Sequence, residues 1–168
     1  LTLECLKAKG LERVYAIDID PYKLAMAKDL GAYMTLNSAQ IDVRAYFRER
    51  GLVDYAFETA GVPFLQAQIL ELVKKKGTVV YIGTAHGDVT LPGGTFERIL
   101  RGELHVTGSW MSFSAPFPGA EWTAAAEYLA AGKVDPLITH RFALSDGMRA
   151  FETLTNRTSN AVKVMYVI

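Results

Sequence analysis

The amino-acid sequence predicts an α/β protein built on a parallel sheet with helices on both faces. Short apolar runs rich in β-branched and aromatic residues alternate along the chain with longer segments of helical pattern. The links between these segments are short, and glycine closes many of them, at Gly10, Gly31, Gly61, Gly77 and Gly83. Alternation of this kind is typical of parallel strands that are joined by right-handed helical crossovers.

The order of the elements follows from local signals. Val14 to Ile17 is a β-branched and aromatic run, and Pro21 suits the first turn of the next helix with Asp20 as its cap. Three consecutive lysines, Lys74 to Lys76, suit the end of a later helix. Up to residue 110 we expect strands at 14–17, 33–36, 52–59, 78–82 and 104–110, and helices at 1–9, 21–30, 39–50, 63–75 and 95–102.

The pattern changes after Trp110. The stretch SFSAPFPGAEW, residues 112–122, contains two prolines, a glycine and several aromatic residues, and it indicates an ordered loop. A helix at 120–131, a strand at 137–143, a helix from Ser145 to Leu154 with a Ser/Asp cap and a strand at 161–168 should follow. This α+β tail is either a separate layer or part of another domain to which the chain returns.

Composition bounds the function. The chain has 168 residues, half of them hydrophobic, which is enough for a sizeable core. A formal net charge of zero argues against a nucleic-acid or membrane surface as partner. The single cysteine, Cys5, excludes an internal disulfide and, with three scattered histidines, a cysteine-rich zinc site within the chain. With no span of roughly 18 apolar residues and no secretion leader in view, we expect a cytoplasmic protein.

Asp18 is the first candidate functional residue, because it ends the apolar run at 14–17. Ligands of doubly wound sheets bind beyond the carboxyl ends of the strands, where a carboxylate can accept hydrogen bonds from both hydroxyls of an adenosine ribose and repel a 2′-phosphate. Lys23, one turn into the next helix, could reach the same ribose. A solvent-facing loop residue or a helix cap is the other interpretation of Asp18.

The glycine motif that accompanies such an acid, G-x-G-x-x-G, lies roughly 20 residues upstream of it. Leu1 is only 17 residues before Asp18, so the motif and its strand would fall just before the sequence begins. We therefore expect a Rossmann-type doubly wound parallel sheet that lacks its first strand and glycine loop, in a truncated record of a longer protein.

With these residues placed, the whole chain resembles the C-terminal half of the zinc-dependent medium-chain alcohol and polyol dehydrogenases. The segments that carry the resemblance are AIDIDPYKLAMAKDLGA (16–32), DYAFETAGVP (54–63), GTVVYIGTAH (77–86) and DPLITHRFAL (135–144). GSWMSFSAPFPGAEW (108–122) resembles the galactitol-1-phosphate 5-dehydrogenase branch, near the sorbitol dehydrogenases. The resemblance implies an NAD-binding Rossmann domain at 1–109 and a segment at 110–168 that returns to the catalytic domain.

The resemblance also implies binding roles, position by position. Asp18 and Lys23 match the residues at the adenosine ribose, and Lys163 matches a basic position, more often arginine, that reaches the pyrophosphate. A turn at 59–61 would lie along the ribose, a turn at 82–84 would approach the nicotinamide, and a strand end at 109–111 would hold the carboxamide. The residues of these three segments that match are Thr59, Ala60, Gly61, Ile82, Gly83, Thr84, Ser109 and Met111.

The implied reaction is oxidation of a secondary alcohol of a polyol or sugar-alcohol phosphate by hydride transfer to NAD. No catalytic residue or zinc ligand is assigned in this chain, since the family's zinc ligands lie in the half that is absent here. A homodimer or homotetramer would form through the edge strand Leu104–Gly108. Two alternatives stay open: a non-catalytic Rossmann nucleotide-binding module, and a zinc-free NADPH-dependent quinone or enoyl-type reductase, against which Asp18 speaks.

Overall fold

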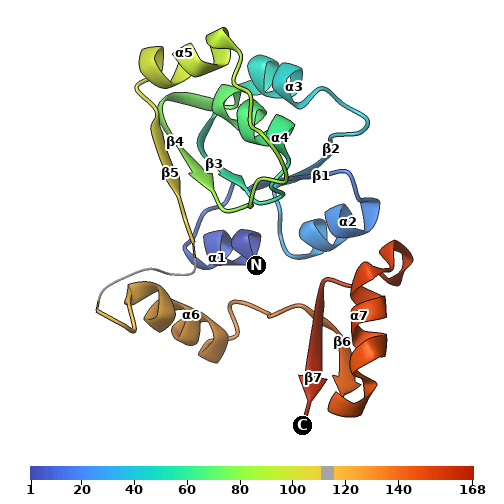
Figure 1. Ribbon diagram of the computed structural model, residues 1–168. Helices are drawn as coiled ribbons and strands as arrows, with labels where there is room; N and C mark the ends of the chain where they lie inside the picture. The colour runs from blue at the N-terminus through green and yellow to red at the C-terminus, as the bar shows by residue number, and fades with distance from the viewer. Residues whose placement is uncertain (111–115) are drawn as a thin grey trace. The chain divides into compact units, whose positions relative to one another are not determined.

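The computed structural model describes residues 1–110 and 116–168, apart from the side chain of Arg157. Every strand pair in these residues is parallel, and helices separate most of the strands, so the predicted α/β class with parallel sheets is confirmed. The chain forms two compact units, one of residues 1–39 with 120–168 and one of residues 40–119 (Figure 1). Within the described residues, no helix is both long and apolar enough to cross a membrane.

The unit of residues 40–119 contains a three-stranded sheet in the order β3-β4-β5. Its elements are α3 (Val43–Arg50), β3 (Val53–Glu58), α4 (Pro63–Gln68), the 3₁₀ helix η1 (Ile69–Glu71), β4 (Val73–Tyr81), α5 (Gly93–Arg101) and β5 (His105–Gly108). Because the three strands are parallel, their carboxyl ends lie at one edge of the sheet.

Apolar side chains from η1 and β4 form the core of this unit. Leu70, Val73 and Val79 are almost completely excluded from solvent, and Ile69 packs with them. Side chains of β3, of α5 and of Leu104 surround this cluster. The core therefore fixes β4 between its two neighbours and sets the positions of the turns that follow β3 and β4.

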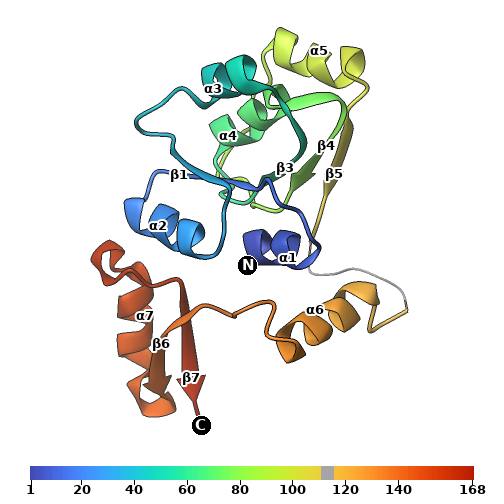
Figure 2. The same ribbon diagram turned by 180° about the vertical axis from the view of Figure 1, so that it is seen from behind.

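The second unit contains two separate pairs of parallel strands, β1-β2 and β6-β7. Its elements are α1 (Thr2–Ala8), β1 (Tyr15–Asp18), α2 (Pro21–Asp29), β2 (Met34–Asn37), α6 (Ala120–Ala130), β6 (Ile138–Ala143), η2 (Leu144–Asp146), α7 (Gly147–Thr155), η3 (Arg157–Ser159) and β7 (Lys163–Val167). α2 packs on β1 and β2, and α7 packs on β6 and β7 (Figure 2). The buried carboxylate of Glu4 in α1 accepts a hydrogen bond from the Asp135 N–H (2.8 Å) and so joins the two parts of the unit.

One predicted helix is wrong in length. The expected helix 63–75 ends at Gln68, and after η1 the chain enters β4 at Val73. Val73 pairs with Val53, but the register then shifts so that Tyr55 pairs with Thr78, and residues 74–77 form an irregular part of β4 between these pairs. The three lysines therefore do not cap a helix. Lys74 is paired with Asp54 (2.8 Å) and Lys76 with Glu103 (3.7 Å), on neighbouring segments.

Of the two helix caps that the sequence predicts, one is confirmed and the other is only partly right. Asp20 caps α2 as predicted, because its carboxylate accepts the Tyr22 N–H (2.9 Å) and Pro21 follows it. The predicted Ser/Asp cap of the helix at 145–154 is only partly right. Ser145 lies inside η2, and Asp146 precedes α7 without forming a side-chain capping bond.

Candidate functional site

Asp18 is the last residue of β1 and lies at the carboxyl end of the strand, opposite Asn37 at the end of β2. It is half-buried. Its Oδ1 atom accepts the N–H groups of Ile19 (2.7 Å) and Asp20 (3.0 Å), which fixes the direction of the side chain. Oδ2 has no hydrogen-bond partner among the described residues, so one carboxylate oxygen remains available to a ligand.

Two of the predicted cofactor turns lie against each other at the ends of β3 and β4. The Glu58 carbonyl oxygen accepts the N–H groups of Ile82 (2.8 Å) and Gly83 (3.0 Å), which begin the second turn. The Gly61 carbonyl oxygen, in the first turn, accepts the His86 N–H (3.1 Å). The turn at 59–61 and the turn at 82–84, far apart in sequence, are therefore one structural feature.

Glycine is required at both contact points. Gly61 has a φ of +70°, and a Cβ there would overlap the carbonyl oxygen of Thr84. A Cβ on Gly83 would overlap the Gly61 nitrogen and lie 2.7 Å from Glu58 Oε2. The main chains of the two turns can approach this closely only because neither residue has a side chain.

Glu58 is a buried carboxylate at the candidate site that the sequence pattern did not single out. It is 4% exposed, and its Oε1 accepts the N–H groups of Ala60 (2.9 Å) and Gly61 (3.0 Å), while Oε2 accepts the Gly61 N–H at 3.2 Å. The signal that could have found it is the one that identified Asp18, a carboxylate at the end of a strand. Here it stands three residues before a glycine.

Gln66 and Tyr81 support the second turn from within the fold. The buried Gln66 amide donates from Nε2 to the Gly83 carbonyl oxygen (3.0 Å), and the Tyr81 hydroxyl donates to the Gln66 carbonyl oxygen (2.7 Å). Gln66 Oε1 has no partner within the part of the chain described. Burial raises the pKa of the Tyr81 phenol above its usual value, and the negative charge of Glu58 raises it further.

Of the four remaining predicted binding residues, three lie in the described part of the chain. Ser109 directly follows β5, and its N–H donates to the Tyr81 carbonyl oxygen (2.9 Å), which brings it beside the turn that starts at Ile82. Met111 lies outside the described residues. Lys23 is exposed in the first turn of α2, and in the described structure no ion pair joins it to Asp18. Lys163 is the first residue of β7 and is half-buried.

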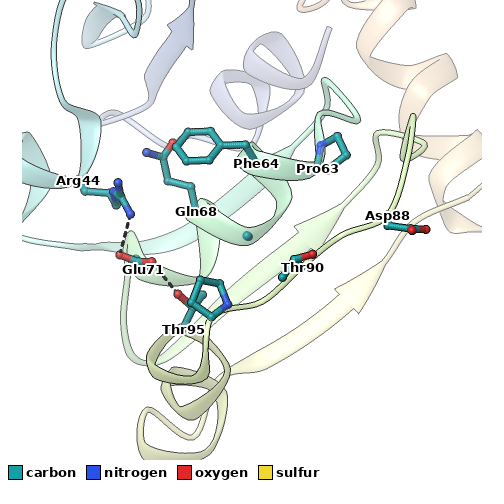
Figure 3. A pocket seen from close by; sticks show the side chains of 10 residues that line it. Arg44, Pro63, Phe64, Gln68, Glu71, Asp88, Thr90 and Thr95 are labelled. Carbon is teal, nitrogen blue, oxygen red and sulfur yellow. Dashed lines mark hydrogen bonds and ion pairs between the residues drawn. The ribbon is translucent and has the colours of Figure 1, made fainter.

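A pocket of about 270 Å³ lies in the same unit, beyond the turns (Figure 3). Pro63 and Phe64 at the start of α4 line it, together with Asp88 on the loop that follows the second turn. Its one cationic side chain, Arg44, already faces Glu71 at 3.7 Å. With two acidic groups beside one paired arginine, this pocket does not favour a phosphate, and we place the candidate site at the turns.

No metal centre is found among the described residues, where no three His, Cys, Asp or Glu side chains gather closely enough to hold an ion. His86 is exposed on the loop after Gly83. His140 lies in β6, where Nδ1 is 3.0 Å from Thr139 Oγ1 and the ring stacks on Phe142. Accordingly, no described residue is assigned as a ligand.

Comparison with known proteins gives a family that agrees with this geometry. The family model described as zinc-binding dehydrogenase matches residues 1–130. Galactitol 1-phosphate 5-dehydrogenase of Escherichia coli (strain K12) is 40% identical over a region that covers 84% of this chain and 42% of that protein. Sorbitol dehydrogenase of Arabidopsis thaliana is 30% identical over a region that covers 99% of this chain and 46% of that protein.

Solved structures agree with these relatives. The crystal structure of galactitol-1-phosphate dehydrogenase from Escherichia coli superposes with a TM-score of 0.85 at 37% identity, over 96% of this chain and 48% of that one. The chain thus spans about half the length of the relatives that it matches. With a family model that covers most of its residues, this chain belongs to the zinc-binding dehydrogenase family.

Proposed function

We propose that this chain is the NAD-binding half of a zinc-dependent dehydrogenase that oxidises a secondary alcohol of a polyol or polyol phosphate. The observation that carries the proposal is the contact between the turns at 59–61 and 82–84, where Gly61 and Gly83 let two main chains meet at the carboxyl ends of β3 and β4, the edge at which ligands of such sheets bind. The names of the relatives, which include galactitol 1-phosphate 5-dehydrogenase and sorbitol dehydrogenase, support the substrate class.

In this proposal the chain binds and orients the cofactor. Asp18 accepts hydrogen bonds from the adenosine ribose with its available oxygen, and Lys23 and Lys163 add positive charge for the ribose and the pyrophosphate. The turns at 59–61 and 82–84 carry the ribose and the nicotinamide, and Ser109 and Met111 hold the carboxamide. When bound, NAD accepts the hydride, and zinc held by residues outside this chain makes the alcohol more acidic.

We propose, further, that residues 110–168 return to the catalytic domain of the same protein and form part of it. Large apolar side chains of α7, among them Met148 and Phe151, are 73% and 62% exposed. Such surfaces indicate a partner that excludes water. The edge strand β5 is the proposed contact between subunits, because all four of its residues are exposed.

A zinc-free, NADPH-dependent reductase is the second candidate. The NADP part of this candidate is supported by a putative zinc-binding dehydrogenase from Sinorhizobium meliloti 1021, solved bound to NADP, which is 26% identical to this chain with a TM-score of 0.82; its name does not support the absence of zinc. Asp18 favours NAD instead, since a carboxylate at the ribose repels the 2′-phosphate.

The intact protein that carries this chain provides the test. We expect it to oxidise galactitol 1-phosphate or sorbitol with NAD, and to lose that activity after dialysis against a zinc chelator and regain it with added zinc. Reduction of quinones or enones by NADPH, unaffected by the chelator, would support the second candidate. Binding of NAD without turnover of any polyol would indicate a non-catalytic nucleotide-binding module.

A further inference from the structure

We propose that Glu58 is a positioning residue whose buried negative charge strengthens the binding of oxidised NAD⁺ more than that of NADH. This inference rests on the proposed function and adds to it a residue that tunes the cofactor. Glu58 connects both turns: its side chain binds the turn at 59–61, and its main-chain carbonyl binds the turn at 82–84.

The first step is the charge itself. Glu58 is 4% exposed, and no lysine, arginine or histidine forms an ion pair with it in the described residues. Its hydrogen-bond donors are the N–H groups of Ala60 and Gly61, at 2.9 to 3.2 Å. Backbone amides stabilise a carboxylate without neutralising it, so the negative charge still acts on its surroundings.

The second step is where this charge lies. Glu58 Oε2 lies 2.7 Å from the point that a Cβ of Gly83 would occupy, so the carboxylate is directly against the second turn. Its charge already acts on the neighbouring strand, where it adds to the rise in the pKa of Tyr81. In the proposed function the turn at 82–84 approaches the nicotinamide ring.

The third step is the difference between the two cofactor forms. The nicotinamide ring of NAD⁺ carries a positive charge and that of NADH is neutral. A fixed negative charge near the ring stabilises the cation and leaves the neutral ring nearly unaffected. Glu58 should therefore lower the dissociation constant for NAD⁺ more than that for NADH, which also makes bound NAD⁺ a weaker hydride acceptor than it would be without the charge.

The test measures both dissociation constants on the intact protein, NADH by its fluorescence and NAD⁺ by competition with NADH. Glu58→Gln keeps the size of the side chain and removes the charge. We expect it to raise the ratio of the NAD⁺ constant to the NADH constant by roughly three- to tenfold. Glu97→Gln, in the same unit, removes an exposed carboxylate paired with Arg101 and should leave the ratio unchanged.

Glu58→Asp separates charge from shape. It shortens the side chain but retains the charge, so both affinities should fall while their ratio stays within about twofold of the unmutated value. The inference is overturned if Glu58→Gln changes both constants equally or neither of them, or if Glu58→Asp shifts the ratio as much as Glu58→Gln. An unmutated protein that binds neither NAD⁺ nor NADH would instead remove the proposed function.

Discussion

Asp18 and Glu58 occupy corresponding places, each as the last residue of a parallel strand, yet their surroundings give them different tasks. Asp18 is half-buried, and one of its carboxylate oxygens accepts two backbone N–H groups, while the other has no partner among the described residues. Glu58 is buried, and both of its oxygens accept backbone N–H groups. A carboxylate with an available oxygen can bind a ligand, whereas a fully bonded one shapes the backbone around it.

The glycines at the contact between the turns give a direct stability test. In Gly61→Ala the new Cβ meets the Thr84 carbonyl, and alanine must also adopt the positive φ of Gly61. The free energy of unfolding should therefore be about 2 kcal/mol lower than in the unmutated protein. Gly94→Ala is the matched control, because a Cβ there meets nothing within 4 Å and α5 gains about 0.5–1 kcal/mol. Denaturant unfolding compares the two, and equal stability of both variants would contradict the close approach.

Tyr81 predicts how stability depends on alkaline pH. Burial raises the pKa of this phenol in the folded protein, so above the ordinary pKa of about 10 the unfolded chain loses the proton more readily. The free energy of unfolding should therefore keep its full value below that pH and fall as the pH rises through the raised pKa of Tyr81. In Tyr81→Phe the fall should be smaller when thermal unfolding is followed between neutral and alkaline pH, and an unchanged profile would exclude Tyr81 as its source.

At the scale of single elements, strands were easier to predict than helix ends. β1, β3 and β5 lie where their β-branched and aromatic residues place them, because a short buried strand is set by local composition. The helix predicted at 63–75 was too long, because Val73 is fully buried against β3 by a tertiary contact that no local pattern contains. The same limit explains the site, in which the strand ends could be predicted but the bonds from Glu58 to both turns could not.

The cap of α2 tests whether Asp20 and Asp18 have separate tasks. Asp20→Ala removes the hydrogen bond to the Tyr22 N–H and should lower the free energy of unfolding by about 1 kcal/mol. Asp20→Asn retains an oxygen acceptor and should cost less. Neither substitution should alter the preference between NAD and NADP. A changed preference in Asp20→Asn would indicate that Asp20, and not Asp18, binds the ribose.

At the scale of the whole molecule, the sheets have an order that local sequence does not reveal. A doubly wound sheet with strand order 3-2-1-4-5-6, without its first strand, leaves one parallel pair and one parallel set of three. The pair β1-β2 and the set β3-β4-β5 have these orders.

The exposed apolar side chains of α7 make a prediction that depends on the length of the protein. In the 168-residue chain, Phe151→Ser should reduce self-association, because it removes one large exposed side chain. In the intact protein the same substitution should lower the melting temperature, since the side chain would then be buried against the catalytic domain. Light scattering measures self-association and thermal unfolding measures the melting temperature. An unchanged melting temperature in the intact protein would show that α7 does not pack against the catalytic domain.

The central claim is that Asp18 selects an adenine dinucleotide without a 2′-phosphate, and its most direct test is the ratio of NAD to NADP affinity in the intact protein. We expect NAD to bind at least about tenfold more tightly, and Asp18→Ala to narrow the ratio by weakening NAD and relieving the repulsion of the phosphate. Equal affinity for NAD and NADP in the unmutated protein, or a ratio that Asp18→Ala leaves unchanged, would contradict the claim.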